Sequence, residues 1–169
     1  MLNKLILRAV LSLSLALGSI GANATLISQD ILDNGAVIGN VTINLDDAQV
    51  WDTDLSVVSS FTEFNIFGYD LTTFSMSNTY FDATYFHDDL SAGLFSLNFD
   101  LTEDFDFFAW TGDIFSDFND NVLTISDDQG VFIFSDQISM GDVSVVPTPA
   151  TLVLFLTAVA GLASRRKNS

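Results

Sequence analysis

The central part of the chain alternates apolar and polar residues with a period of two, which predicts β-strands that bury one face. The clearest run places Phe95, Leu97, Phe99 and Leu101 on one side and polar residues on the other. Shorter runs of the same kind place these residues on the apolar side: Val41, Ile43, Leu45, Phe105, Phe107, Ala109, Leu123 and Ile125. No stretch of comparable length in this region keeps the helical period.

Turn-forming sequences such as Asp33-Asn34-Gly35 and Asp127-Asp128-Gln129-Gly130 separate these runs. Residues 82–94 have a more helix-like pattern, but their Tyr, Phe and Thr content favours strand or loop. Many short strands joined by turns are typical of antiparallel folds. We therefore expect an all-β antiparallel β-sandwich, jelly-roll-like or immunoglobulin-like, with roughly eight to ten strands.

Residues 1–24 have the three parts of a secretory signal peptide. Lys4 and Arg8 supply positive charge, an apolar stretch follows, and Ala22-Asn23-Ala24 has the small-x-small pattern of a cleavage site. We expect a signal helix that signal peptidase removes by cutting between Ala24 and Thr25. A buried amphipathic helix is the alternative interpretation, but the three parts occur together and in order.

The other end of the chain predicts a single transmembrane helix over residues 150–164, bounded by Arg165, Arg166 and Lys167. At about 1.5 Å per residue the uncharged part covers roughly 21 Å, less than the roughly 30 Å of hydrocarbon in a bilayer. The expected span is therefore short. Its basic end should stay cytoplasmic, which leaves the residues before Pro147 outside the inner membrane.

Residues 25–146 then form one domain with an extreme charge pattern. The chain has 22 Asp and Glu residues, and all five of its Lys and Arg residues lie in the two end segments. Such a surface repels phosphate backbones, so nucleic-acid binding is excluded. The chain has no cysteine, which excludes disulfides, zinc-thiolate sites and cysteine nucleophiles.

Aspartate and asparagine oxygens are the candidate metal ligands of this domain. Asp113, Asp117, Asn119 and Asp120 lie close in sequence and could bind Ca²⁺ at one end of a sandwich. A solvated turn explains the same residues. The glycine that an EF-hand loop requires is absent, because Val122 occupies its position. Ca²⁺ is thus the one cofactor that the sequence suggests.

Catalysis is not expected from the sequence. The carboxylate pairs Asp52/Asp54 and Asp104/Asp106 resemble those of glycosidases, but period-two alternation produces such pairs without function. His87 is the only histidine, so a histidine-based metal triad cannot form. Exposed aromatic side chains could instead stack on sugar rings, with Trp51 and Trp110 as candidates and Tyr69, Tyr80 and Tyr85 beside them. Packing in the core is the alternative for these aromatic residues.

The segment Val146-Pro147-Thr148-Pro149-Ala150, the apolar stretch and the terminal basic cluster together resemble the PEP-CTERM sorting signal. That family has a Val-Pro-Glu-Pro-Ala motif, and Thr148 occupies the position of its glutamate. A weaker resemblance covers residues 39–57, which are similar to an N-terminal β-hairpin in such proteins.

The resemblance implies cleavage by an exosortase-like enzyme, transient anchoring in the inner membrane, and release to the cell surface or extracellular matrix. We expect a non-enzymatic structural component that associates with anionic exopolysaccharide through divalent cations. A carbohydrate-binding module is the alternative, and a polysaccharide hydrolase is a third.

Overall fold

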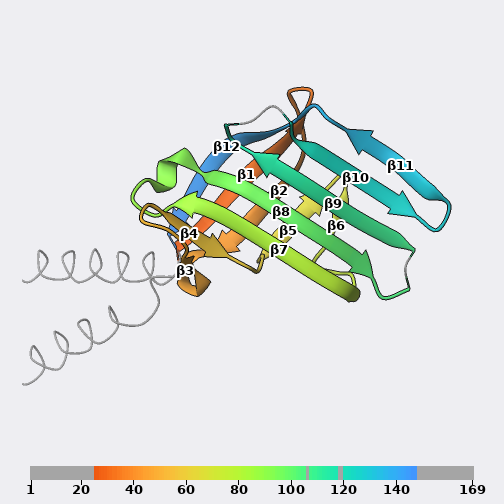
Figure 1. Ribbon diagram of the computed structural model, residues 1–169, viewed down its shortest axis with the longest axis horizontal. Coiled ribbons are helices and arrows are strands. Elements are labelled where there is room, and N and C mark those ends of the chain that lie inside the picture. Colours follow the sequence, from red (N-terminus) through yellow and green to blue (C-terminus); the bar gives the residue numbers. More distant parts are fainter. Residues whose placement is uncertain (1–24, 106, 118–119, 148–169) are drawn as a thin grey trace, which may run out of the picture. The chain divides into compact units, whose positions relative to one another are not determined.

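The computed structural model describes residues 25–105, 107–117 and 120–147. These residues form strands and two one-turn 3₁₀ helices (Figure 1). The elements are β1 (Thr25–Asp33), β2 (Ala36–Asn44), η1 (Leu45–Asp47), β3 (Gln49–Val50), β4 (Leu55–Val58), β5 (Glu63–Ile66), β6 (Tyr69–Asp70), β7 (Met76–Phe86), η2 (Leu90–Ala92), β8 (Leu94–Glu103), β9 (Phe108–Phe115), β10 (Val122–Asp127), β11 (Gly130–Ser135) and β12 (Ile138–Pro147).

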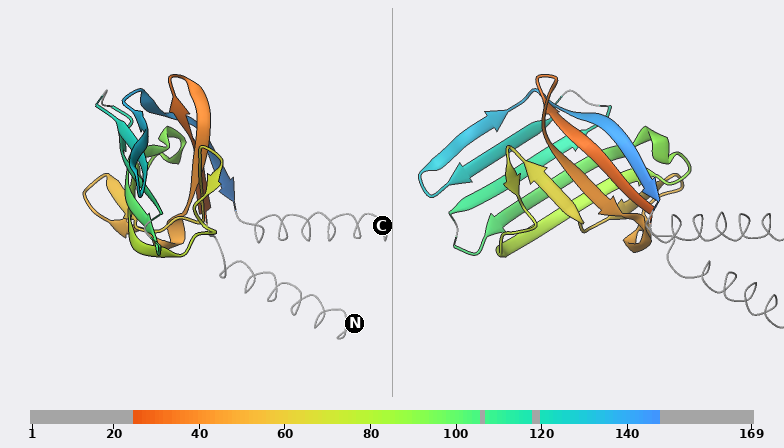
Figure 2. Two further views of the ribbon diagram at one scale, coloured as in Figure 1. Left: turned by 90° about the vertical axis from the view of Figure 1, so that its right-hand side faces the viewer. Right: turned by 180° about the vertical axis from the view of Figure 1, so that it is seen from behind.

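The strands form two antiparallel sheets, which confirms the predicted all-β architecture. The larger sheet has the order β11-β10-β9-β8-β7-β4-β3, and the smaller one has the order β12-β1-β2-β5-β6. Strands β7 to β11 follow one another as an antiparallel meander. Figure 2 shows the two sheets as facing layers.

The core lies between the two sheets and belongs to both. Its centre is an aromatic group around Phe64 of β5, whose ring makes edge contacts with Phe61, Phe81 and Phe99 at centroid distances of 5.5, 6.0 and 4.9 Å. Aliphatic residues extend it in both directions. Most predicted apolar positions are buried in it, namely Val41, Ile43, Leu97, Phe99, Leu101, Leu123 and Ile125, whereas Leu45 and Phe95 are only half-buried.

The alternation predicted for residues 104–109 is wrong. Phe105 and Phe107 are 74% and 55% exposed, and the inward side chains of β9 are those of Trp110 and Ile114. The reason is that β9 begins only at Phe108, after a turn. A turn resets which parity faces the core, and a continuous period-two pattern across it does not reveal the change.

Residues 82–94 contain no α-helix. They comprise the end of β7, the one-turn η2 and the beginning of β8, which confirms the preference for strand and loop. No helix in the described part of the chain has the length and apolar character needed to cross a membrane. The predicted signal helix and the predicted transmembrane helix lie outside the described residues.

Several aspartates stabilise turns of this fold. The Asp70 carboxylate accepts hydrogen bonds from the backbone N–H and the hydroxyl of Thr72, at 3.1 and 2.6 Å. Asp89 does the same for Ser91, at 3.1 and 2.5 Å. Such Asx turns hold the backbone in a reversal. Part of the acidic composition therefore serves the loops.

Candidate functional site

The outer face of the larger sheet is a polar surface built from two rows of paired residues. One row is Tyr80–Asp100–Thr111 across β7, β8 and β9, and the other is Asp82–Asn98–Asp113. Paired residues on neighbouring antiparallel strands project from the same face of a sheet. Their neighbours along the chain, such as Phe81 and Leu101, are buried. These six residues, which we name the polar face, therefore point away from the core.

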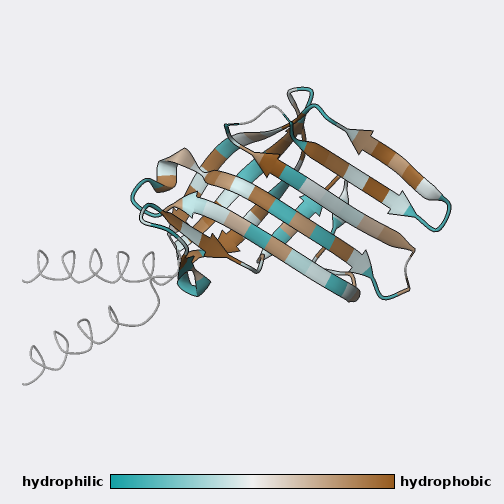
Figure 3. Cartoon of the chain, in the orientation of Figure 1, coloured by the Kyte–Doolittle hydropathy of each residue, from teal (hydrophilic) through white to brown (hydrophobic). Residues whose placement is uncertain are grey.

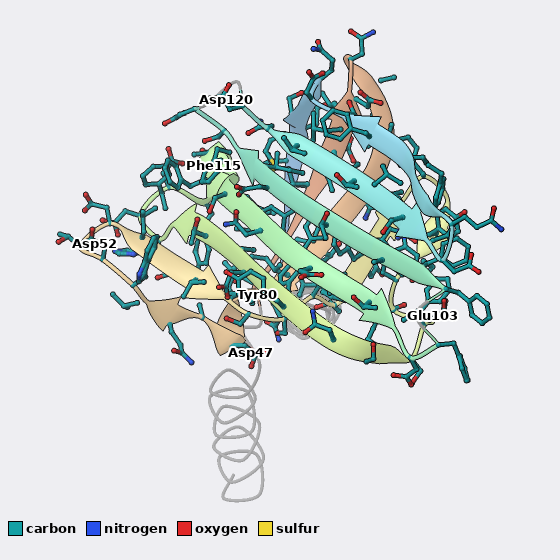
Figure 4. The ribbon with its side chains drawn as sticks, turned by 45° about the vertical axis from the view of Figure 1, so that its right-hand side comes forward. Asp47, Asp52, Tyr80, Glu103, Phe115 and Asp120 are labelled. Carbon is teal, nitrogen blue, oxygen red and sulfur yellow. The ribbon has the colours of Figure 1, made fainter. Side chains whose placement is uncertain are left out.

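Tyr80 is the aromatic residue of the polar face. Its side chain is 51% exposed, and Figure 4 shows it on the outer side of the larger sheet. A hydrogen bond to Asp82 and the negative charge of that carboxylate raise the pKa of Tyr80, and Asp113 adds a smaller repulsion. The Asp82 carboxylate also accepts a hydrogen bond from the Ser59 hydroxyl at 2.6 Å. The phenol therefore stays neutral beside two acids.

Hydropathy colours alternate along the strands of the larger sheet, as expected for a sheet with one buried and one solvated face (Figure 3). Every Asp and Glu side chain that the structure describes is exposed or half-buried. Residues 25–147 contain no Lys or Arg. In the described ranges, Nε2 of His87 lies 3.8 Å from the carboxylate of Asp88, which is an ion pair only when the imidazole is protonated. Apart from one buried carboxylate oxygen of Glu103, the described acidic groups thus face solvent, and no Lys or Arg of residues 25–147 balances their charge.

The described acids of the predicted calcium cluster do not come together. Asp113 lies on β9, whereas Asp117 and Asp120 are exposed in the loop that follows. No group of three His, Asp or Glu side chains that could hold a metal ion comes together in residues 25–105, 107–117 and 120–147. Asn119 lies outside the described residues. Asp113 is paired with Asn98, so its side chain projects from the polar face of the larger sheet. This orientation keeps the Asp113 carboxylate apart from the loop that contains Asp117 and Asp120.

The two tryptophans have opposite environments. Trp110 is fully buried and packs against Phe74, Tyr69 and Phe108, with ring centroids 5.1, 5.9 and 5.8 Å away. The prediction that Trp110 stacks on sugars is therefore wrong, because no sugar ring can reach it. Trp51 is 67% exposed, just after β3.

The other tyrosines are less available than Tyr80. Tyr85 is buried, and burial raises the pKa of its phenol although a hydrogen bond with Ser56 partly opposes the shift. Tyr69 is half-buried against Trp110. Trp51 and Tyr80 are consequently the aromatic candidates for sugar stacking that the structure leaves exposed.

His87 lies 3.4 Å from the hydroxyl of Ser56 through its Nδ1 atom. With Asp88 next to it, the group has the residue types of a nucleophilic triad. However, Ser56 is buried and only 4% exposed, so a substrate carbonyl cannot reach its oxygen. The arrangement is a packed polar contact between β4 and the end of β7, and it supports no nucleophilic chemistry.

The two carboxylate pairs also have local roles. Asp52 accepts a hydrogen bond from the backbone N–H of Thr53 at 2.6 Å, and Asp104 accepts one from the Ser75 hydroxyl. Asp54 is exposed, and Asp106 lies outside the described residues. None of Asp52, Asp54 and Asp104 lines the cleft of about 590 Å³ that the structure describes.

A cleft of about 590 Å³ opens between β12 and the ends of β9 and β10. Its volume is in the range of small-ligand sites. It is lined by Gln29, Ala92, Phe115, Ser116, Asn121, Asp136, Gln137, Ile138, Ser139, Met140 and Gly141. The lining has hydrogen-bonding groups and one carboxylate but no cation, so it suits a neutral polyol better than an anion.

Two buried amides hold the walls of this cleft. The Gln29 side chain donates to the carbonyl of Gly141 at 3.2 Å and accepts from the N–H of Leu94 at 2.7 Å, which links β1 and β12 to the larger sheet. Asn121 accepts from the N–H of Phe115 at 2.8 Å and donates to the carbonyls of Phe115 and Ile138 at 2.9 and 3.1 Å.

Sequence reasoning missed both residues, although Gln29 left a signal. It occupies an inward position between Ile27 and Ile31, where the alternation calls for an apolar side chain. A polar residue at a core position must have hydrogen-bond partners when it is buried. Asn121 gave no comparable signal, because a turn sequence explains an asparagine equally well.

The predicted processing sites lie largely outside the described residues. Thr25 begins β1, and Val146 and Pro147 end β12. Ala24, Thr148, Pro149, Ala150, Arg165, Arg166 and Lys167 lie outside. No family model, curated protein or solved structure matches this chain.

Proposed function

We propose that this chain is an exported, non-enzymatic protein of the bacterial cell surface or extracellular matrix, which associates with anionic exopolysaccharide through divalent cations. The main support is the exposed acidic surface of residues 25–147, which contain no Lys or Arg. Like charges would repel an acidic polymer directly. Divalent cations accumulated on both surfaces provide the attraction instead.

Export and sorting form the first part of the proposal. The signal-peptide pattern and the PEP-CTERM-like tail are its support, together with a compact unit at Leu26–Val146 that lies between them. The proposed processing partners are signal peptidase and an exosortase-like enzyme. The proposal includes a signal helix and the single transmembrane helix of an inner-membrane precursor. It also includes the jelly-roll or immunoglobulin type of the sandwich.

The mass and N-terminal sequence of the protein recovered from the cell surface test the sorting. We expect a chain that begins at Thr25 and lacks the apolar segment of residues 150–164. Replacing Pro147 and Pro149 with alanine should leave the unprocessed precursor in the inner membrane. A surface form that still begins at Met1 would contradict the proposal.

Divalent cations should bind diffusely, because no dedicated cluster of ligands is present among the described residues. Cations that reduce self-repulsion stabilise the folded state. Ca²⁺ and Mg²⁺ at equal ionic strength should therefore raise the melting temperature by similar amounts, and both should exceed Na⁺. A response to Ca²⁺ alone, at a one-to-one stoichiometry, would indicate a specific site and contradict diffuse binding.

Co-sedimentation with polygalacturonate tests the bridging itself. We expect binding with Ca²⁺ and its loss with EDTA or high NaCl, because salt screens exposed charges. Neutral dextran is the control polymer. Asp82→Asn, Asp100→Asn and Asp113→Asn together should weaken calcium-dependent sedimentation, whereas the same sedimentation without Ca²⁺ would argue against cation bridging.

A second function is favoured by the exposure of Tyr80 on the polar face. An exposed ring beside carboxylate, amide and hydroxyl groups can stack on a sugar and hydrogen-bond its hydroxyls. In this alternative the chain is a carbohydrate-binding module. Binding to a neutral glycan array, insensitive to EDTA and lost in Tyr80→Ala or Trp51→Ala, would favour it. Trp110 is unsuitable as a control, because its removal would damage the core.

A further inference from the structure

Strand β11 is an uncovered edge of the larger sheet. In the described residues it pairs with β10 on one side and has no strand on the other. Figure 1 shows it at the end of the sheet opposite β3. The outer backbone N–H and C=O groups of an edge strand can pair with another strand.

Three side chains of β11 are both apolar and exposed, whereas Ser135 at its end is polar and buried. Val131, Phe132 and Phe134 are 61%, 45% and 63% exposed, and Figure 3 shows the strand largely in hydrophobic colours. Its sequence, Gly130-Val131-Phe132-Ile133-Phe134-Ser135, has neither charge nor proline. Short uncharged segments of high β-propensity are prone to pair with other strands.

The other sheet edges are protected. β3 and β6 have only two residues each, and β6 includes Asp70. β12 contains the exposed Asp142 and ends at Pro147. Natural edges avoid self-pairing through short strands, charges and prolines. β11 is six residues long and has neither charge nor proline, and its one irregularity is a bulge that leaves Phe132 without a partner on β10.

The charges around β11 identify which partner can approach it. In a domain rich in acids, the strand is an uncharged strip between Asp128 and Asp136. Antiparallel pairing of two copies around Ile133 would place Phe132 opposite Phe134 of the second copy. Asp136 would then face Gly130, and no acid would face an acid. A register centred on Phe132 would place Asp128 directly opposite Asp136 of the second copy, and like charges at paired positions are unfavourable.

From these observations we infer that β11 is a self-association edge, at which two copies of this chain pair antiparallel about Ile133. The pairing joins two larger sheets into one continuous sheet. Cross-strand aromatic pairs stabilise such an arrangement, and the two Phe132–Phe134 pairs are related by the twofold axis. The inference does not depend on which glycan or cation the protein binds.

Single cysteines test the register in the full chain, which has no cysteine of its own. In Ile133→Cys the two sulfur-bearing residues face each other with Cα atoms about 5 Å apart, a separation suited to a disulfide. In Val131→Cys they are offset by roughly 13 Å along the strand. Mild oxidation in non-ionic detergent should crosslink Ile133→Cys efficiently. Val131→Cys and Val50→Cys, at the β3 edge, should remain largely uncrosslinked.

Matched valine substitutions test the interface without a crosslink. Val131→Asp adds a charge beside Asp136 of the second copy, whereas Val50→Asp adds the same charge to the opposite edge. Sedimentation velocity of the full chain should show a dimer that Val131→Asp weakens by about tenfold or more. Val50→Asp should leave the dimer unchanged. An unmodified chain that stays monomeric, equal effects of the two substitutions, or equal crosslinking of all three cysteine variants would overturn the inference.

Discussion

The ring of Phe99 on β8 covers Gly112 of β9, its cross-strand partner. A Cβ atom added at Gly112 would lie 2.3 Å from both Cε1 and Cζ of Phe99. The glycine thus provides the space that the ring fills in the core, beside Phe64. An aromatic residue packed over a strand glycine compensates for the missing side chain.

Gly112→Ala should lower the free energy of unfolding by about 1–3 kcal/mol, because the new methyl group displaces a packed ring. Urea denaturation measures the change. In a Phe99→Leu background the same substitution should cost much less, since the colliding ring atoms are gone. Additive effects of the two substitutions would contradict the proposed contact.

Gln29→Met should destabilise the fold by about 1–3 kcal/mol at nearly constant side-chain volume. The reason is that the buried N–H of Leu94 loses its acceptor and the carbonyl of Gly141 loses its donor. Chemical denaturation measures the loss. Gln49→Met, on the exposed edge strand β3, is the matched control and should change stability by less than about 0.5 kcal/mol. Equal effects at both positions would show that the amide is not a link between the sheets.

Asn121→Asp should destabilise the domain more at pH 7 than at pH 4. The aspartate would place a charge near the carbonyls of Phe115 and Ile138, which raises its pKa in the folded state. A carboxyl group with a raised folded pKa penalises folding as the pH rises above its unfolded value of about 3.9.

The difference in unfolding free energy from the unmodified chain, measured at each pH, tests this dependence. Asn44→Asp is the control, because the Asn44 side chain acts as an acceptor for the N–H of Asp46 and a carboxylate can replace it. A penalty for Asn121→Asp that does not vary with pH would contradict the role of its two donated hydrogen bonds.

Stability should fall as the pH rises above 10. Burial raises the pKa of Tyr85 from the ordinary value of 10.0, and Asp82 raises that of Tyr80. Both phenols keep their protons longer in the folded state, so the stabilisation is complete below pH 10 and is lost as the pH passes the folded pKa values. Residues 25–147 contain no Lys, Arg or Cys, which makes tyrosine the titrating side chain in this range.

Tyr85→Phe should reduce the loss of stability between pH 9 and pH 11. Urea denaturation measures the free energy of unfolding at each pH, and absorbance reports the formation of phenolate. Tyr85→Phe also removes a hydrogen bond with Ser56, so a modest cost at neutral pH is expected. If Tyr85→Phe and the unmodified chain lose stability equally between these pH values, burial of Tyr85 is not the cause.

Much of the fold follows from local periodicity in the sequence. Alternation at Leu97, Phe99 and Leu101, separated from other runs by Asp- and Gly-containing turns, was sufficient to predict strands, their buried faces and an all-β architecture. The acidic surface was predictable for the same reason, because polar positions of alternating strands face solvent. These features depend on neighbouring residues and on charge, which the sequence states directly.

Only the tertiary structure decided which aromatic residues are exposed and which polar groups meet. Trp110 is buried because a turn before Phe108 sets the parity of β9, and the sequence pattern runs through that turn without a break. Tyr80 is exposed because its neighbour Phe81 on β7 faces the core. Gln29 meets Leu94, 65 positions away, through the packing of two sheets. Strand order likewise makes β11 an uncovered edge. Parity after turns and contacts between sheets arise from long-range packing, and a period-two pattern contains no information about either.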